Sequence, residues 1–176
     1  TLFRVNIDFQ NVNIPNGMET DADKECARYE AKIKALGGVD LQLLGLGHNG
    51  HIGFNEPLSS LNSRTRAKAL TPETYEQNAP LFDKPEDMPM RAFTMGVGTI
   101  MDAKSVILLV TGAEKAQILK KAVEGPVTSM ISATALQYHN KALVICDEEA
   151  GALLEGKKYY NWIFEKEPQW QKYHNI

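Results

Sequence analysis

Residues 45–57, Gly-Leu-Gly-His-Asn-Gly-His-Ile-Gly-Phe-Asn-Glu-Pro, include polar side chains that could transfer protons. The imidazole of His51 has an ordinary pKa of ~6.5, which suits a general acid or base near neutral pH. A carboxylate such as Glu56 can fix the tautomer of a nearby histidine and stabilise its imidazolium form. The amide of Asn49 can complete the hydrogen-bond chain. His51, Glu56 and Asn49 therefore form a candidate catalytic site.

The glycines of this segment also match a nucleotide-binding pattern. Gly45, Gly47 and Gly50 satisfy G-x-G-x-x-G, whose last glycine opens a helix in dinucleotide-binding proteins. Here Gly53 and Pro57 follow, and both residue types are unfavourable inside a helix. The region about 20 positions further on is basic, where a ribose-binding site would need an acidic residue. The context therefore does not favour a nucleotide site.

Two other interpretations of the same segment are open. His48, His51 and Glu56 could supply metal ligands. Their spacing belongs to a turn and not to the helical i, i+4 arrangement, so we expect no metal site. In a purely structural role, His51 would satisfy a loop carbonyl and Glu56 would face water. The residues alone are compatible with this role and with catalysis.

Basic residues mark two candidate anion sites. Lys115 stands just after Val110-Thr111-Gly112, at the predicted start of a helix, where backbone N–H groups attract anions. Arg64, Arg66 and Lys68 form a second basic cluster, and strand alternation would place all three on one face. A solvated surface accounts for either set as well.

The composition is that of an ordinary globular protein. The chain has 176 residues, 43% hydrophobic and 23% charged, which predicts a single domain over residues 1–176. The net charge of −3 does not favour a nucleic-acid partner. No apolar run approaches ~18 residues, so we expect no membrane span. Cys26 and Cys146 are far apart in sequence and predict reduced thiols in a cytoplasmic protein.

The elements that must position these residues alternate between strands and helices. We expect strands at 41–46, 66–70, 92–99, 105–110 and 142–146, and helices at 22–36, from Pro72, at 113–123, at 133–138 and through 159–164. The strand at 105–110 is apolar enough to be buried on both faces, and 142–146 reads as a second buried strand. The aromatic residues of the last helix are expected in the core or an interface. The alternation predicts an α/β fold, a Rossmann-like open parallel sheet flanked by helices, with residues 45–57 at its ligand-binding carboxyl edge.

Several segments together resemble one known family. Residues 43–57 are similar to the signature of glucosamine-6-phosphate deaminases. The match continues at residues 59–61, 63–66, 94–103, 112–116, 122–127, 133–137 and 144–147. It covers nearly the whole chain, and its motifs are specific.

The resemblance implies a cofactor-independent reaction on a small-molecule sugar phosphate. Glucosamine 6-phosphate and water would give fructose 6-phosphate and ammonium through ring opening, C1–C2 enolisation and imine hydrolysis. His51 would move the proton between the anomeric hydroxyl and the ring oxygen, with Glu56 and Asn49 positioning it. Lys115 would bind the substrate phosphate.

The chain departs from the family pattern at several positions. Many relatives carry aspartate where Asn49 stands, and a phosphate-binding arginine where Pro80 stands, so Arg91 is a candidate replacement. The family also has an amino-terminal segment with a strand, a phosphate loop and the aspartate that abstracts the C2 proton. We expect this sequence to match the carboxyl-terminal two-thirds of a deaminase, with the sheet incomplete at its amino-terminal end.

The resemblance also bears on regulation and on alternative functions. In the allosterically regulated, hexameric branch of the family, residues matching Ser59, Arg66, Lys68 and Tyr159 contribute to an allosteric site for an amino-sugar phosphate. The protein is expected to be a monomer or a homo-oligomer. One alternative is a non-catalytic sugar-phosphate sensor domain, although no helix-turn-helix is visible. Another is a 6-phosphogluconolactonase, which should lack the run from Phe54 to Pro57.

Overall fold

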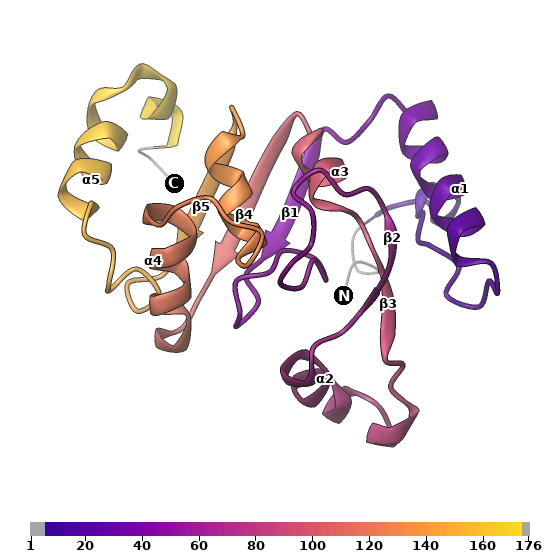
Figure 1. The fold of residues 1–176 in the computed structure, drawn as a ribbon. Helices are drawn as coiled ribbons and strands as arrows, with labels where there is room; N and C mark the ends of the chain where they lie inside the picture. The colour runs from indigo at the N-terminus through magenta and orange to yellow at the C-terminus, as the bar shows by residue number, and fades with distance from the viewer. Residues whose placement is uncertain (1–5, 174–176) are drawn as a thin grey trace.

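The computed structural model describes residues 6–173, and its centre is a three-stranded parallel sheet (Figure 1). The strand order is β1 (Leu41–Gly45), β4 (Ser105–Val110) and β5 (Ala142–Cys146). In the register, Leu43 pairs with Ile107 and Ile107 pairs with Leu143. The predicted α/β fold with a parallel sheet flanked by helices is therefore confirmed.

The helices begin and end where local sequence signals place them. The α-helices are α1 (Ala22–Ala35), α2 (Pro72–Asn78), α3 (Val97–Met101), α4 (Ala116–Glu124) and α5 (Lys157–Lys166). The Asp21 side chain caps α1 by accepting the backbone N–H of Lys24 at 3.0 Å. Gly38, with φ +92°, donates its N–H to Ile33 O at 2.9 Å and ends the helix. The predicted start of α2 at Thr71-Pro72 is likewise confirmed.

Short 3₁₀ helices account for two differences from the sequence prediction. They are η2 (Phe9–Asn11), η3 (Ala79–Leu81), η4 (Pro85–Asp87), η5 (Ala113–Lys115), η6 (Ser132–Tyr138) and η7 (Pro168–Tyr173). The predicted helix at 133–138 is the 3₁₀ helix η6, and the predicted helix at 113–123 begins with η5 before α4. Hydrophobic periodicity does not distinguish these two helix types over one or two turns.

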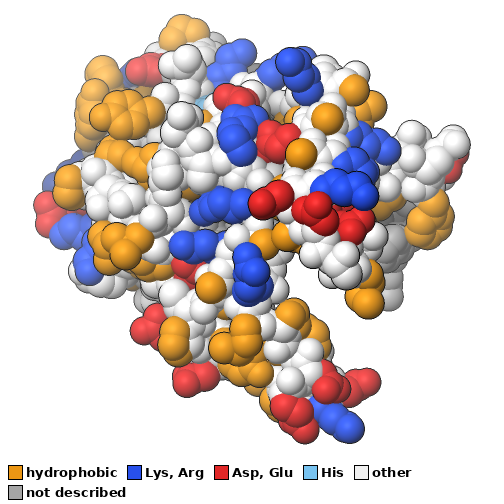
Figure 2. All heavy atoms as spheres, turned by 45° about the vertical axis from the view of Figure 1, so that its right-hand side comes forward, with side chains coloured by type: hydrophobic (Ala, Val, Ile, Leu, Met, Phe, Trp, Pro, Cys, Tyr) orange, Lys and Arg blue, Asp and Glu red, His pale blue; other side chains and the backbone are white. Residues whose placement is uncertain are grey.

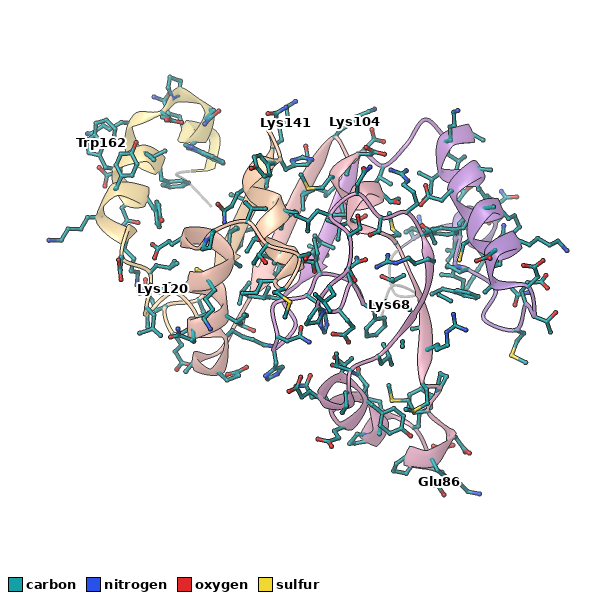
Figure 3. The ribbon with its side chains drawn as sticks, in the orientation of Figure 1. Lys68, Glu86, Lys104, Lys120, Lys141 and Trp162 are labelled. Carbon is teal, nitrogen blue, oxygen red and sulfur yellow. The ribbon has the colours of Figure 1, made fainter. Side chains whose placement is uncertain are left out.

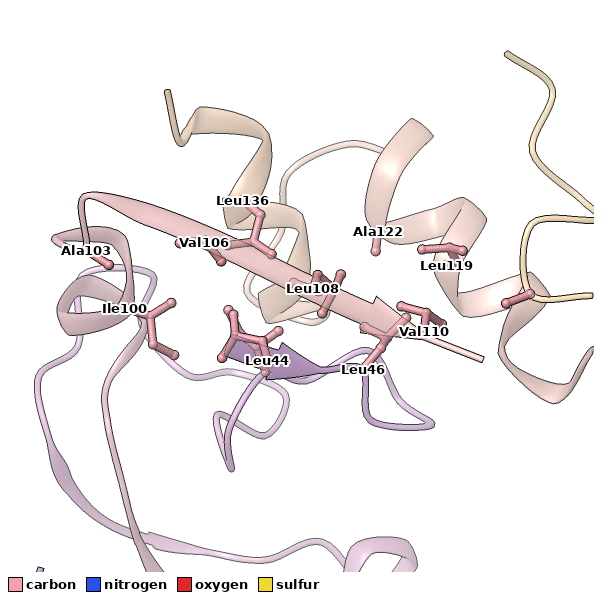
Figure 4. Close-up of a cluster of buried hydrophobic side chains, with 13 residues drawn as sticks. Leu44, Leu46, Ile100, Ala103, Val106, Leu108, Val110, Leu119, Ala122 and Leu136 are labelled. Atoms are coloured by element: carbon pink, nitrogen blue, oxygen red, sulfur yellow. The ribbon is translucent and has the colours of Figure 1, made fainter. Parts of the chain in front are cut away.

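The hydrophobic core lies on one face of the sheet. Val106, Leu108 and Val110 of β4 are buried against side chains from α4 and η6, including Leu119 and Leu136 (Figure 4). The opposite face is open within the described residues: Leu43, Leu109 and Ile145 are 59%, 43% and 46% exposed. The prediction that 105–110 is buried on both faces, and 142–146 with it, was therefore wrong for the described chain. An apolar sequence allows both faces of a strand to be buried, but a face is buried only where other elements pack on it.

A separate two-stranded ribbon carries an arm away from the sheet. β2 (Arg66–Ala69) and β3 (Arg91–Thr94) are antiparallel, and the chain between them forms α2, η3 and η4. This arm stands out from the body, with charged side chains at its tip, among them Glu86 (Figures 2 and 3). The predicted strand at 92–99 ends at Thr94, because Gly96 is the N-cap of α3. Gly96 also packs on the backbone of Ser63, where a Cβ would lie 2.0 Å from the carbonyl oxygen.

The last helix does not supply core residues. Tyr159, Trp162 and Phe164 of α5 are all exposed, so the core alternative for its aromatic residues was wrong. Trp162 lies at the outer end of the molecule (Figure 3). None of the helices in residues 6–173 is long and apolar enough to cross a membrane.

Candidate active site

The segment after β1 is a tight turn and not the start of a helix. Gly50 donates its N–H to Gly47 O at 2.9 Å, and Gly47 donates to His51 O at 2.9 Å. Gly50 has φ +84°, which favours glycine. A Cβ at Gly47 would lie 2.4 Å from Nε2 of His51, so the imidazole occupies space that only glycine leaves. The helix required for dinucleotide binding does not follow this turn.

The turn brings the three predicted catalytic side chains into one hydrogen-bonded cluster. His51 Nδ1 lies 2.7 Å from Asn49 Oδ1 and 3.1 Å from Glu56 Oε2. Asn49 Nδ2 donates to the same Glu56 oxygen at 2.8 Å, which fixes the orientation of the amide. Both neighbours of Nδ1 are acceptors when Glu56 is ionised, so Nδ1 carries the proton. The lone pair of neutral His51 is therefore on Nε2.

The electrostatics favour an ionised Glu56 beside a neutral His51. Glu56 is only 1% exposed, and burial alone raises the pKa of its carboxyl. Hydrogen bonds from Thr74 and Asn49, the nearby His51 and the backbone N–H of Thr71 outweigh burial and hold that pKa below its ordinary value. Burial lowers the pKa of His51, although Glu56 opposes the shift. Near neutral pH, His51 is therefore neutral and can accept a proton, and the ionised carboxylate of Glu56 lies on its Nδ1 side.

Lys115 lies at the same edge of the sheet. Its Nζ donates to Leu46 O, just after β1, at 3.0 Å. Its positive charge lowers the pKa of His51, and burial lowers the pKa of Lys115 itself. The nearby N–H of Gly112 is already used by Asp147 Oδ2 at 2.9 Å. The structure thus brings a lysine ammonium beside the turn that carries His51.

The residues of the predicted allosteric site lie at different distances from this cluster, and Ser59 is directly beside it, since its backbone N–H donates to Glu56 O at 3.0 Å. Ser59 is buried, and among residues 6–173 its hydroxyl has no hydrogen-bond partner, whereas Arg66 donates to Asn55 Oδ1 at 2.9 Å. Lys68 follows on β2, whereas Tyr159 lies on α5 at the far end of the molecule (Figures 1 and 3). A single chain does not bring Tyr159 to the other three residues.

Two further predictions concern metal and phosphate ligands. Within residues 6–173, no three His, Cys, Asp or Glu side chains lie close enough to hold a metal ion. Pro80 lies in η3 on the arm, and Arg91 is the exposed first residue of β3. The arm between the two strands of the ribbon contains no arginine.

Sequence reasoning missed the residues that support the cluster. Thr71 was expected only as a helix cap, but its N–H also reaches Glu56 Oε1 at 3.3 Å. Ser132 hydrogen-bonds to the turn from 80 positions away. Asn55 was part of the family signature without an assigned role. No local pattern signals such long-range contacts.

The fold and the cluster define an α/β protein with a hydrogen-bonded histidine–carboxylate cluster at the carboxyl edge of a parallel sheet, where ligands bind in such folds. Residues 1–145 match the family of glucosamine-6-phosphate isomerases/6-phosphogluconolactonase, and the chain belongs to that family.

Individual relatives are similar to most of this chain. It is 54% identical to a glucosamine-6-phosphate deaminase of Hahella chejuensis, over 88% of the chain and 59% of the relative. It is 49% identical to that of Pseudarthrobacter chlorophenolicus, over 96% of the chain and 65% of the relative. The chain thus spans about three fifths of the length of these curated relatives.

Solved structures show the same fold. A structure described as a monomeric glucosamine-6-phosphate deaminase superposes with a TM-score of 0.80 at 42% identity, over 83% of this chain and 61% of that chain. A 6-phosphogluconolactonase from Trypanosoma cruzi gives 0.57 at 25% identity, over 75% and 52%. The likeness to the deaminase is the stronger of these two.

Proposed function

We propose that this chain carries the ring-opening and phosphate-binding residues of a glucosamine-6-phosphate deaminase. The enzyme would convert glucosamine 6-phosphate and water to fructose 6-phosphate and ammonium. The observation that carries the proposal is the cluster at His51, whose Nδ1 faces two acceptors and whose Nε2 keeps its lone pair. The names of the relatives support the same substrate.

Ring opening needs one group that takes a proton and returns it nearby. Nε2 of His51 would accept the proton of the anomeric hydroxyl and donate it to the ring oxygen as the C1–O5 bond breaks. Glu56 stays ionised and stabilises the imidazolium between these two steps. Enolisation between C1 and C2 and hydrolysis of the imine then complete the reaction. Proton transfers and hydrolysis of this kind require no cofactor.

The phosphate of the substrate would bind Lys115. Its ammonium has one N–H on Leu46 O, which leaves two for phosphate oxygens. The lysine lies beside the turn, so a sugar bound through its phosphate would extend toward His51. Arg91 is a candidate second ligand, because the arm itself contributes no arginine.

The alternative functions use the cluster to different degrees. Hydrolysis of a lactone also breaks the C1–O5 bond, needs a base for the attacking water and leaves a ring oxygen that takes a proton, so the His51–Glu56 pair suits that reaction as well. A sensor domain that only binds a sugar phosphate needs no histidine held with Nε2 free. We place deamination first and lactone hydrolysis second, because the deaminase relatives are 54% and 49% identical to this chain and the lactonase structure is 25% identical.

The test measures ammonium release from glucosamine 6-phosphate by the protein that carries this chain. Replacing His51→Ala should slow turnover by ~10²–10⁴-fold, the usual contribution of a positioned acid–base group. His48→Ala is the matched control, because His48 is an exposed histidine of the same turn, and it should retain activity. Near-normal release by His51→Ala, or faster hydrolysis of 6-phosphogluconolactone than deamination, would reject the proposal.

Location and assembly belong to the same proposal. The two cysteines are unpaired, with Cys26 buried and Cys146 exposed, which supports a reducing, cytoplasmic location. The protein would act as a monomer or a homo-oligomer, and the deaminase structure at 42% identity is described as monomeric. Sedimentation analysis distinguishes the two states.

A further inference from the structure

One buried hydroxyl from a distant element holds the catalytic turn. Ser132, the first residue of η6, is 1% exposed. Its Oγ accepts the backbone N–H of Ile52 at 3.2 Å and donates to Asn55 O at 2.8 Å. The next residue, Ala133, donates its N–H to Gly50 O at 3.0 Å. The first two residues of η6 therefore hydrogen-bond to three backbone groups of the turn.

The backbone groups bonded by Ser132 lie next to the acid–base pair in the sequence. Ile52 directly follows His51, and Asn55 directly precedes Glu56. The side chain of Asn55 adds bonds from Nδ2 to Ile52 O at 2.9 Å and to Met95 O at 2.8 Å. The single Ser132 hydroxyl is thus bonded at both ends of the segment that separates the imidazole from the carboxylate.

We propose that Ser132 is a positioning residue that fixes the separation of the His51 imidazole and the Glu56 carboxylate, and with it the tautomer of His51. Without its hydroxyl, the N–H of Ile52 and the carbonyl of Asn55 become buried groups that lack this partner, so the turn shifts to recover hydrogen bonds. A shift weakens the contact of Nδ1 with Glu56. The Nδ1–H tautomer then loses one of the two acceptors that select it, and Asn49, which is itself bonded to Glu56, shifts with the carboxylate.

The second buried hydroxyl of η6 supplies a matched control. Thr134 is fully buried, and its Oγ1 accepts from Thr128 N at 2.9 Å and lies 2.7 Å from Ile131 O. These partners all belong to residues 128–134 and not to the turn. Thr134→Val removes this hydroxyl while keeping the side-chain shape.

The test is nitrogen-15 NMR of the protein with labelled histidines, with the His51 signal assigned by its loss in His51→Gln. Above the pKa of His51, the unaltered protein should show the Nδ1–H tautomer. Ser132→Ala should show a mixture of tautomers, Ser132→Thr should restore the single tautomer, and Thr134→Val should leave it unchanged. If Ser132→Ala does not fold, Ser132→Cys is measured instead, since a thiol is a weaker hydrogen-bonding group of similar size.

Two results would overturn the proposal. One is an unchanged Nδ1–H tautomer in the Ser132 variant. The other is an equal change in Thr134→Val, which would indicate general loosening of η6.

The effect on turnover rests on the proposed function, whereas the effect on the tautomer does not. Misplacing a catalytic group by about 1 Å costs roughly 10²-fold in rate, so Ser132→Ala should lower kcat by about that factor and change KM little. If His51→Ala keeps full activity while the tautomer still responds to Ser132, the deaminase proposal fails and the positioning role stands.

Discussion

At the scale of single residues, Lys115 combines a structural contact with a candidate binding role. Its ammonium is tied to Leu46 O at the end of β1, which positions the side chain at the turn. Burial lowers its pKa, although the negative charge of the neighbouring Glu114 opposes the shift. Leu46 itself is buried, so the lysine also satisfies a carbonyl with little access to water.

Lys115→Met should therefore weaken binding of glucosamine 6-phosphate without weakening binding of unphosphorylated glucosamine. A charge-assisted hydrogen bond contributes ~1.5–3 kcal/mol, which corresponds to roughly 10–100-fold in affinity. Calorimetric titration with both sugars measures the ratio. Lys120→Met is the control, because Lys120 lies on α4 and pairs with Glu155 at the surface. An equal loss of affinity for both sugars would assign Lys115 to the fold alone.

At the scale of elements, one carboxylate anchors α5. Glu124, the last residue of α4, accepts the backbone N–H of Gly156 at 2.8 Å and of Glu155 at 3.1 Å, and the hydroxyl of Tyr160 at 2.9 Å. The hydrogen bond from Gly156 is the main reason that the pKa of Glu124 lies below its ordinary value. Burial and the bond to Glu124 raise the pKa of Tyr160 to about 12. α5 itself buries no residue, and a cavity of about 660 Å³ separates it from β5.

Glu124→Ala should therefore loosen α5 while leaving the central sheet intact. Losing these bonds should reduce the hydrogen-exchange protection of residues 155–160 by about 10-fold or more. Because the pKa of Glu124 is lowered in the folded state, the anchoring is complete above the ordinary glutamate pKa of ~4.3 and is lost as the pH falls through the lowered value.

The difference between the variant and the unaltered protein should thus disappear in acid. Lys121→Ala, an exposed neighbour on α4, is the control and should not change protection. Unchanged protection in Glu124→Ala would show that other contacts hold α5.

At the scale of the whole molecule, the described chain is built as a sheet covered on one side. Neighbouring residues of β4 alternate between the two faces, so Leu108 is buried and Leu109 is exposed. The register places Leu109 beside Ile145, which extends the open face across β4 and β5. The assignment of residues 1–176 to one domain stays a prediction.

Leu108 and Leu109 form a matched pair for testing this arrangement. Leu108→Ala should lower the free energy of unfolding by about 2–5 kcal/mol, because it leaves a cavity in the core. Leu109→Ala should cost about 1 kcal/mol or less, since its side chain is already partly in water. Urea denaturation of the two variants measures the difference. Equal losses would show that the second face is also covered in solution.

Features that depend on a few neighbouring residues could be predicted from the sequence. Asp21 caps α1 through a residue three positions on, and Thr71-Pro72 starts α2 in the same way. The apolar runs predict the positions of β1, β4 and β5. Asn49, His51 and Glu56 lie within eight residues of each other, so a glycine-rich turn is enough to bring their side chains together. The catalytic roles of these side chains stay predictions.

Only the tertiary structure decided which distant elements meet. Lys115 of η5 reaches Leu46 across 69 positions, and Ser132 of η6 reaches Ile52 across 80, because the chain after β4 packs back over one face of the sheet. The same packing covers one face of β4 and leaves Leu109 exposed, although the sequence of the strand is apolar throughout its second half. Local pattern sets what each segment can form and bury. The placement of the other elements sets which of its groups find partners and which face water.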